Sequence, residues 1–172
     1  MLFSLIVFVF GFSWATLIYL LFASILVVIT FIDLDHQIIP DVLSLPGIVV
    51  GFVGSFMIPW MSWVDSLLGI LLGGGLLFLV AVGYEYLAKR EGMGGGDIKL
   101  LAMLGAFLGW RSIFPILFLA SLAGTLIGVP YMLFKKEDSK LALPFGPFLS
   151  SAAILYLLWG AKLLEWYLGL FK

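Results

Sequence analysis

The sequence contains no charged side chain before Asp33, so residues 1–32 form one uncharged stretch. At about 1.5 Å per helical residue, this stretch is longer than one crossing of a roughly 30 Å hydrocarbon core requires. Further charge-free windows of spanning length follow at residues 42–64, 66–84, 112–134 and 141–161. A repeated pattern of this kind predicts a polytopic helical membrane protein.

The composition supports the same class. Of 172 residues, 63% are hydrophobic and 11% are charged, against about 45–50% and about 25% in soluble domains. Nine Lys and Arg against ten Asp and Glu argue against a nucleic-acid partner. The chain has no Cys and one His, so a disulfide or a thiolate metal site is excluded and we expect no metal and no cofactor.

The charges and the break at residues 11–14 (GFSW) divide the chain into expected helices. These lie at residues 1–11, 14–34, 42–59, 64–88, 97–110, 112–134 and 146–169. We therefore predict an all-α polytopic membrane protein with about six transmembrane helices plus a partial N-terminal helix, in a single membrane-embedded domain over residues 1–172. The opening segment is too short to span, and we expect Met1 to begin within a longer helix.

Alternate crossings place the polar loops at residues 33–41, 89–97 and 135–140 on one face of the membrane. That face carries Lys89, Arg90, Lys135, Lys136 and Lys140, with Lys99 nearby; the other has Arg111, Lys172 and, depending on its depth, Lys162. The excess of basic residues predicts that the three loops face the cytoplasm.

Two aspartates on this face are candidates for chemistry. Asp33 is the first charge after the uncharged stretch, and Asp97 precedes a nearly charge-free segment. Ionisable residues at the membrane boundary are functional candidates. A structural interpretation is also open for each polar group: Asp97 as a helix N-cap, Asp41 as a capping or solvated loop residue, and the glycines before Asp97 as a flexible turn.

Two carboxylates brought together in a low-dielectric setting share one proton, because both cannot ionise easily. Such a pair activates water and protonates a leaving amine, as in aspartic proteases. From the helix ends alone, we expect Asp97 to be the ionised base and Asp33 the protonated acid, although the pair titrates as a unit. Gly94, Gly95 and Gly96 would let an extended substrate backbone approach Asp97.

Three motifs in order resemble one known family. Residues 92–101 (GMGGGDIKLL) are similar to the second aspartate motif of bacterial type IV prepilin peptidases, the GxGD aspartyl proteases. Residues 31–33 (FID) with 39–41 (IPD) resemble the first aspartate motif, and residues 143–148 (LPFGPF) the loop before the last helix. The resemblance implies a GxGD-type intramembrane aspartyl protease fold with Asp33 and Asp97 as the catalytic pair. We assign substrate-binding or loop roles to Gly94, Gly95, Gly96, Lys99, Pro40 and Asp41.

The resemblance also implies a substrate and a place. It predicts cleavage of the leader of a type IV prepilin or a type II secretion pseudopilin, at the cytoplasmic side of the cell inner membrane. Bifunctional members carry Cys pairs in an N-terminal loop and also methylate the new N-terminus. This chain has no Cys, so methyl transfer is not predicted, and we favour a truncated peptidase domain over a short peptidase-only member.

Other functions remain open at this point. Intramembrane Asp residues also suit an ion-coupled transporter, but here they gather at one face, and no internal repeat is visible. A structural assembly protein with small-residue helix contacts is a third possibility. Within the GxGD proteases, a presenilin-like enzyme is disfavoured by the Pro-Asp and Pro-Phe-Gly-Pro motifs. The expected partners are the prepilin substrate and the lipid bilayer, with the oligomeric state left open.

Overall fold

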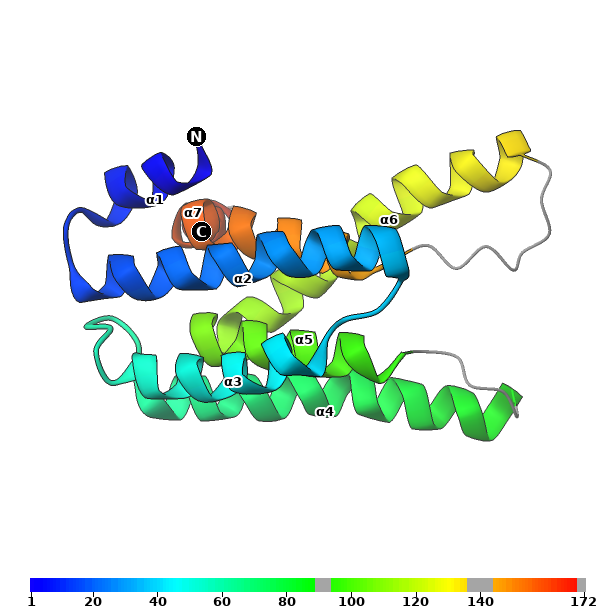
Figure 1. The fold of residues 1–172 in the computed structure, drawn as a ribbon, viewed down its shortest axis with the longest axis horizontal. Coiled ribbons are helices and arrows are strands. Elements are labelled where there is room, and N and C mark those ends of the chain that lie inside the picture. Colours follow the sequence, from blue (N-terminus) through cyan, green and yellow to red (C-terminus); the bar gives the residue numbers. More distant parts are fainter. Residues whose placement is uncertain (89–93, 136–143, 170–172) are drawn as a thin grey trace.

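The computed structural model describes residues 1–88, 94–135 and 144–169. Within these residues the chain forms seven α-helices and one short 3-10 helix, which confirms the all-α prediction. Their bounds are α1 Leu2–Phe10, α2 Trp14–His36, α3 Asp41–Ser55, α4 Trp63–Ala88, α5 Gly95–Leu108, η1 Trp110–Ser112, α6 Ile113–Lys135 and α7 Gly146–Gly169. Each expected segment has one counterpart among these helices (Figure 1).

Local sequence explains where the helices break. Gly11 and Gly109 have positive φ angles of 65° and 77°, which glycine adopts without the penalty of a Cβ. Ser13 caps α2 by accepting a hydrogen bond from the backbone N–H of Thr16. The predicted end of the third segment at residue 59 was wrong: α3 ends at Ser55, ahead of Pro59, which disfavours a helical conformation at the preceding residue.

Helix α5 lies at the centre of the fold. Residues 100–107 are all buried, as expected for a short helix embedded among others. Glycines allow its neighbours to approach: Gly69 of α4 meets the backbone of Gly105, and Gly51 of α3 meets Phe107. The hydroxyl of Ser66 on α4 also donates to the backbone carbonyl of Ala106 at 2.7 Å. Helix α5 is thus in backbone contact with α4 and in close side-chain contact with the backbone of α3.

The outer surface is apolar. Large side chains such as Leu71, Leu79, Phe118 and Leu126 are each more than 60% exposed, which suits helices bathed in lipid rather than water. In the described part of the chain, three helical stretches are long and apolar enough to span: Trp14–His36, Trp63–Leu87 and Trp110–Pro130. Asp41–Ser55 and Gly146–Gly160 are shorter apolar helices. The prediction of a polytopic membrane protein is confirmed. Of the six helices expected to cross the membrane, three have spanning length among the described residues.

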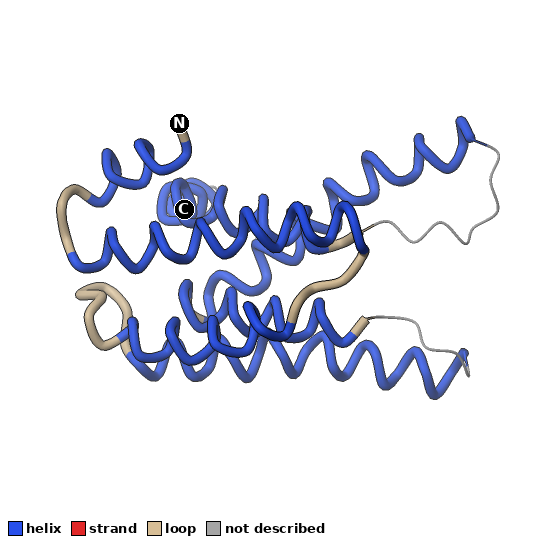
Figure 2. Tube along the Cα trace, in the orientation of Figure 1, coloured by secondary structure: helices blue, strands red, loops and turns tan. Residues whose placement is uncertain are grey.

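The helix ends gather as the alternation of crossings predicted. The C-terminal ends of α2, α4 and α6 and the N-terminal ends of α3, α5 and α7 lie toward the right of Figure 1. The loop between α1 and α2 and the loop between α3 and α4 lie at the opposite end (Figure 2). The right-hand end therefore brings together the two segments that contain Asp33 and Asp97. We call it the aspartate end.

Candidate active site

Asp33 lies in the last turn of α2 and is 4% exposed. Its Oδ2 atom accepts a hydrogen bond of 2.9 Å from the backbone N–H of Gly146, the first residue of α7. A Cβ atom at position 146 would lie 2.6 Å from this oxygen, closer than real Cβ contacts allow. Glycine at 146 is therefore what permits the carboxylate to reach the helix terminus.

Asp97 is the third residue of α5, and its side chain is partly buried. The structural interpretation of Asp97 as an N-cap is wrong, since Gly94 is the N-cap of α5 and no side chain makes a capping hydrogen bond there. Helix α5 is not one of the three helices of spanning length. Burial first, and then the charge of Asp33, raise the pKa of Asp97 to about 6. The two carboxylates, from different helices, therefore lie within electrostatic reach of each other.

The structure changes the expected division of protons between the pair. That expectation considered only the C-terminal end of α2, which disfavours a charge on Asp33. The N–H of Gly146 adds the N-terminus of α7, which favours the ionised form of Asp33 against the cost of its burial. Since each carboxylate now faces a helix N-terminus, the helix ends alone no longer make Asp97 the base and Asp33 the acid.

The glycines before Asp97 divide into two kinds. Among the described residues, a Cβ atom at Gly94 or Gly95 would meet nothing within 4 Å. A Cβ atom at Gly96 would lie 2.9 Å from the Cβ atom of Ile39, which is buried. The room at Gly96 is thus used by the chain itself, whereas no atom of the described residues occupies the position of a Cβ atom at Gly94 or Gly95.

The remaining predicted residues lie at the starts of two helices. Pro40 is the N-cap of α3, and Asp41 is its first residue. Both carboxylate oxygens of Asp41 accept hydrogen bonds from Nζ of Lys99 on α5, at 2.7 and 2.6 Å. Asp41 is therefore not merely a solvated loop residue, because its charge is paired across two helices.

Comparison with known proteins identifies the family. Residues 20–129, which include Asp33 and Asp97, match the type IV leader peptidase family. The chain belongs to this family. No solved structure matches.

Relatives over most of the chain carry one name, prepilin leader peptidase/N-methyltransferase. The protein from Aeromonas hydrophila is 39% identical over 156 residues, which cover 91% of this chain and 54% of that protein. The protein from Pseudomonas aeruginosa is 38% identical over 159 residues, 92% of this chain and 55% of the relative. The protein from Legionella pneumophila is 35% identical over 161 residues, 93% and 56% respectively. This chain of the leader peptidase family thus spans about half the length of these relatives.

The contact of Gly146 with Asp33 was missed by sequence reasoning. The motif at residues 143–148 drew attention to this loop, but no pattern in the sequence indicates that its glycine meets a carboxylate 113 positions earlier. Gly92, Met93 and Leu143, which belong to the motifs of the resemblance, lie outside the described residues. Among the residues that the structure does describe, no three His, Cys, Asp or Glu side chains gather in a metal-binding group.

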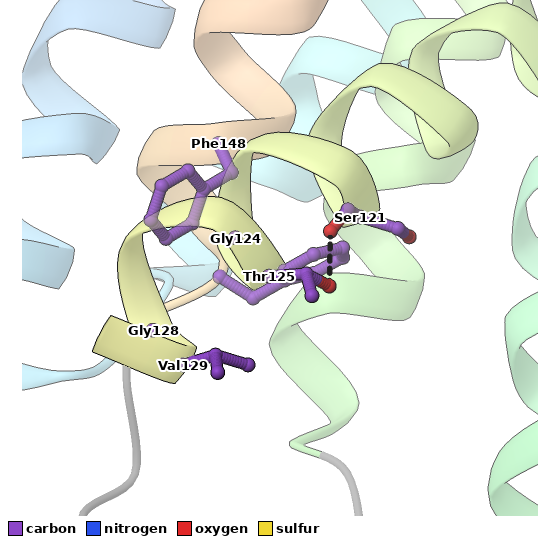
Figure 3. A pocket seen from close by; sticks show the side chains of 7 residues that line it. Ser121, Gly124, Thr125, Gly128, Val129 and Phe148 are labelled. Carbon is purple, nitrogen blue, oxygen red and sulfur yellow. Dashed lines mark hydrogen bonds between the residues drawn. The ribbon is translucent and has the colours of Figure 1, made fainter. Parts of the chain in front are cut away.

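A groove of about 340 Å³ adjoins this loop, between α6 and α7. Figure 3 shows its walls, where Phe148 faces the α6 residues and the hydroxyl of Thr125 donates to the backbone carbonyl of Ser121 at 2.8 Å. The groove is lined by Ser121, Gly124, Thr125, Gly128, Val129, Phe145 and Phe148. Because Phe145 and Phe148 lie on either side of Gly146 in the chain, one end of this apolar groove lies next to the hydrogen bond between Gly146 and Asp33.

Proposed function

We propose that this chain acts as an aspartyl endopeptidase that cleaves the leader peptide of type IV prepilins or pseudopilins. The observation that carries the proposal is that Asp33 on α2 and Asp97 on α5 lie within electrostatic reach of each other in a member of the leader peptidase family. The name shared by the relatives, prepilin leader peptidase/N-methyltransferase, supports this substrate class. We assign only the peptidase reaction to this chain.

In the proposed reaction the pair holds one proton. The ionised carboxylate takes a proton from a water molecule as the water oxygen attacks the scissile carbonyl carbon. The protonated carboxylate polarises the carbonyl oxygen, and a proton then passes to the leaving amine. The N–H of Gly146 fixes the orientation of Asp33 and supports its ionised state. Gly94 and Gly95 give an extended substrate backbone room beside Asp97.

We place the reaction at the cytoplasmic face of the cell inner membrane, within one membrane-embedded domain over residues 1–172. The excess of basic residues in and near the three polar loops, which the sequence places on the same face as the two aspartates, supports this orientation. A scissile bond close to the membrane interface would then meet Asp33 at the end of a helix of spanning length.

The test is cleavage of a purified prepilin by the purified chain in detergent or lipid, followed as a mobility shift on a gel. We expect wild-type cleavage and no product with Asp33→Ala or Asp97→Ala. A folded wild-type chain that leaves the prepilin intact would contradict the proposed function. Full cleavage by either alanine variant would contradict the roles of the two aspartates.

The transporter alternative gives a different result. Its basis was the presence of intramembrane aspartates, and membership in the leader peptidase family argues against it. Proton or cation flux into liposomes containing the chain, lost on Asp33→Ala while prepilin stays intact, would support transport.

A further inference from the structure

A short segment links the two parts of the candidate site. Residues 37–41, here called the strap, run from the end of α2 to the start of α3. Gln37 adopts a left-handed conformation with φ 54°, and its N–H donates to the backbone carbonyl of Asp33 at 2.8 Å. The strap is thus bonded at its first residue to the backbone of the first aspartate.

The strap then contacts α5 on both sides of Asp97. Ile39, which is 7% exposed, sits against Gly96, the residue before Asp97. Asp41 forms an ion pair of 2.6 Å with Lys99, two residues after Asp97. One contact is apolar and excludes any side chain at Gly96; the other is charged and lies nearer the surface, with side chains 37% and 54% exposed. Five consecutive residues therefore tie the backbone at Asp33 to the turn that carries Asp97.

We propose that the strap sets the separation of the two carboxylates, and that Asp41 and Lys99 are positioning residues rather than substrate-binding ones. This inference rests on the proposed function. Each charge has the other as its partner, and Nζ of Lys99 donates to both carboxylate oxygens of Asp41, which links the start of α3 to the first turn of α5. Catalysis is sensitive to small displacements of reacting groups, so an ion pair at the surface affects rate through geometry.

A double-mutant cycle tests the strap. We compare Asp41→Asn, Lys99→Met and the double variant, with Lys99→Arg as the conservative replacement and Arg111→Met as a control for loss of an exposed charge at the other end. We expect each single variant to lower kcat by roughly 5- to 20-fold, with KM within about twofold of wild type. The double variant should be no worse than either single one, because both remove the same contact. Lys99→Arg should retain most of the activity.

Two results would overturn the positioning role. A rise in KM at unchanged kcat in Lys99→Met would make Lys99 a substrate contact. Losses that multiply in the double variant would show that the two residues act independently. Helical circular dichroism and melting temperature identify a variant that fails to fold, in which case Lys99→Arg and Asp41→Glu provide the comparison.

A second measurement does not depend on activity. The chain contains no Cys, so Asp33→Cys and Asp97→Cys introduce a unique pair of thiols. We expect a short bifunctional thiol reagent to cross-link them, and the yield to fall severalfold when Lys99→Met is added. An unchanged yield overturns the strap whether or not the chain cleaves prepilin, whereas absent wild-type cleavage bears on the proposed function alone.

Discussion

The carboxylates at the two ends of the molecule have different hydrogen-bond and electrostatic partners. At the end opposite the aspartate end, Oδ2 of Asp65 accepts from the N–H of Ser62 at 3.1 Å, and its Oδ1 accepts from Nε1 of Trp110 at 3.0 Å. Both oxygens of Asp65 thus have neutral donors. At the aspartate end, Asp33 receives the N–H of Gly146 on one oxygen and lies within electrostatic reach of Asp97.

This difference separates a structural carboxylate from a chemical one. Ser62 and Asp65 form a capping box at the start of α4, since Asp65 accepts from the N–H of Ser62 and the Ser62 hydroxyl accepts from the N–H of Val64. The negative charge of Asp65 also suits the helix dipole. A buried carboxylate within electrostatic reach of a second carboxylate gains no such stability, and sharing one proton is the arrangement of lowest energy for the two. The sequence indicated Asp33 and Asp97, and not Asp65, as candidates for chemistry, and the structure shows that the partners of Asp65 differ from those of Asp33.

The largest expected effect is on the aspartate end. Asp33→Asn and Asp97→Asn should each lower the rate of prepilin cleavage by about 10³-fold or more, because each removes a group that transfers a proton. Asp65→Asn is the matched control and should cleave at close to the wild-type rate. Initial rates from gel densitometry check all three. Equal losses at Asp65 and Asp97 would remove the distinction between the two ends.

The next effect concerns the helix terminus that faces Asp33. Gly146→Ala places a methyl group 2.6 Å from Oδ2 of Asp33, so the carboxylate must move and its hydrogen bond must weaken. We expect cleavage to slow by about 10- to 100-fold, the scale found when a reacting group is misplaced. The control is Gly75→Ala on α4, where a Cβ atom meets nothing within 4 Å. Wild-type rates for Gly146→Ala would show that this contact does not orient Asp33.

The helices were predictable from the sequence because membrane helices are long runs without charged residues, and such runs can be read directly along the chain. Most predicted bounds lie within one or two residues of the observed ones, and the misplaced end of α3 follows from Pro59. The candidate aspartates were also visible, since few charges interrupt the apolar pattern. Both results depend on local information along the chain.

The partners of those aspartates were not predictable in the same way. Gly146 reaches Asp33, and Ile39 fills the space at Gly96, through tertiary packing that no local pattern encodes. For this reason, the expectation that Asp97 is the base and Asp33 the acid did not take into account the N-terminus of α7, which lies against Asp33. It considered the dipole of the helix that carries Asp33 and omitted a helix that begins more than a hundred residues later.

A smaller effect should appear in stability as a function of pH. The pKa of Asp97 is raised to about 6 by burial and by Asp33, against about 3.9 in an unfolded chain. The folded state therefore holds the proton more tightly, and its contribution to stability is complete below pH 4 and lost as pH rises through 6. Melting temperature in detergent should fall over this range more steeply in wild type than in Asp97→Asn. Parallel curves would contradict the raised pKa.

The smallest effect returns to the opposite end. Asp65→Ala removes an acceptor from the N–H of Ser62 and from the indole of Trp110, and should cost about 1 kcal/mol of stability. For a chain of this size that corresponds to a fall of roughly 2–4 °C in melting temperature. Because the capping box contacts neither aspartate of the other end, the cleavage rate at a temperature well below melting should stay unchanged. A variant that melts normally but cleaves slowly would instead couple the two ends, and Asp65 could no longer serve as the structural reference for Asp33.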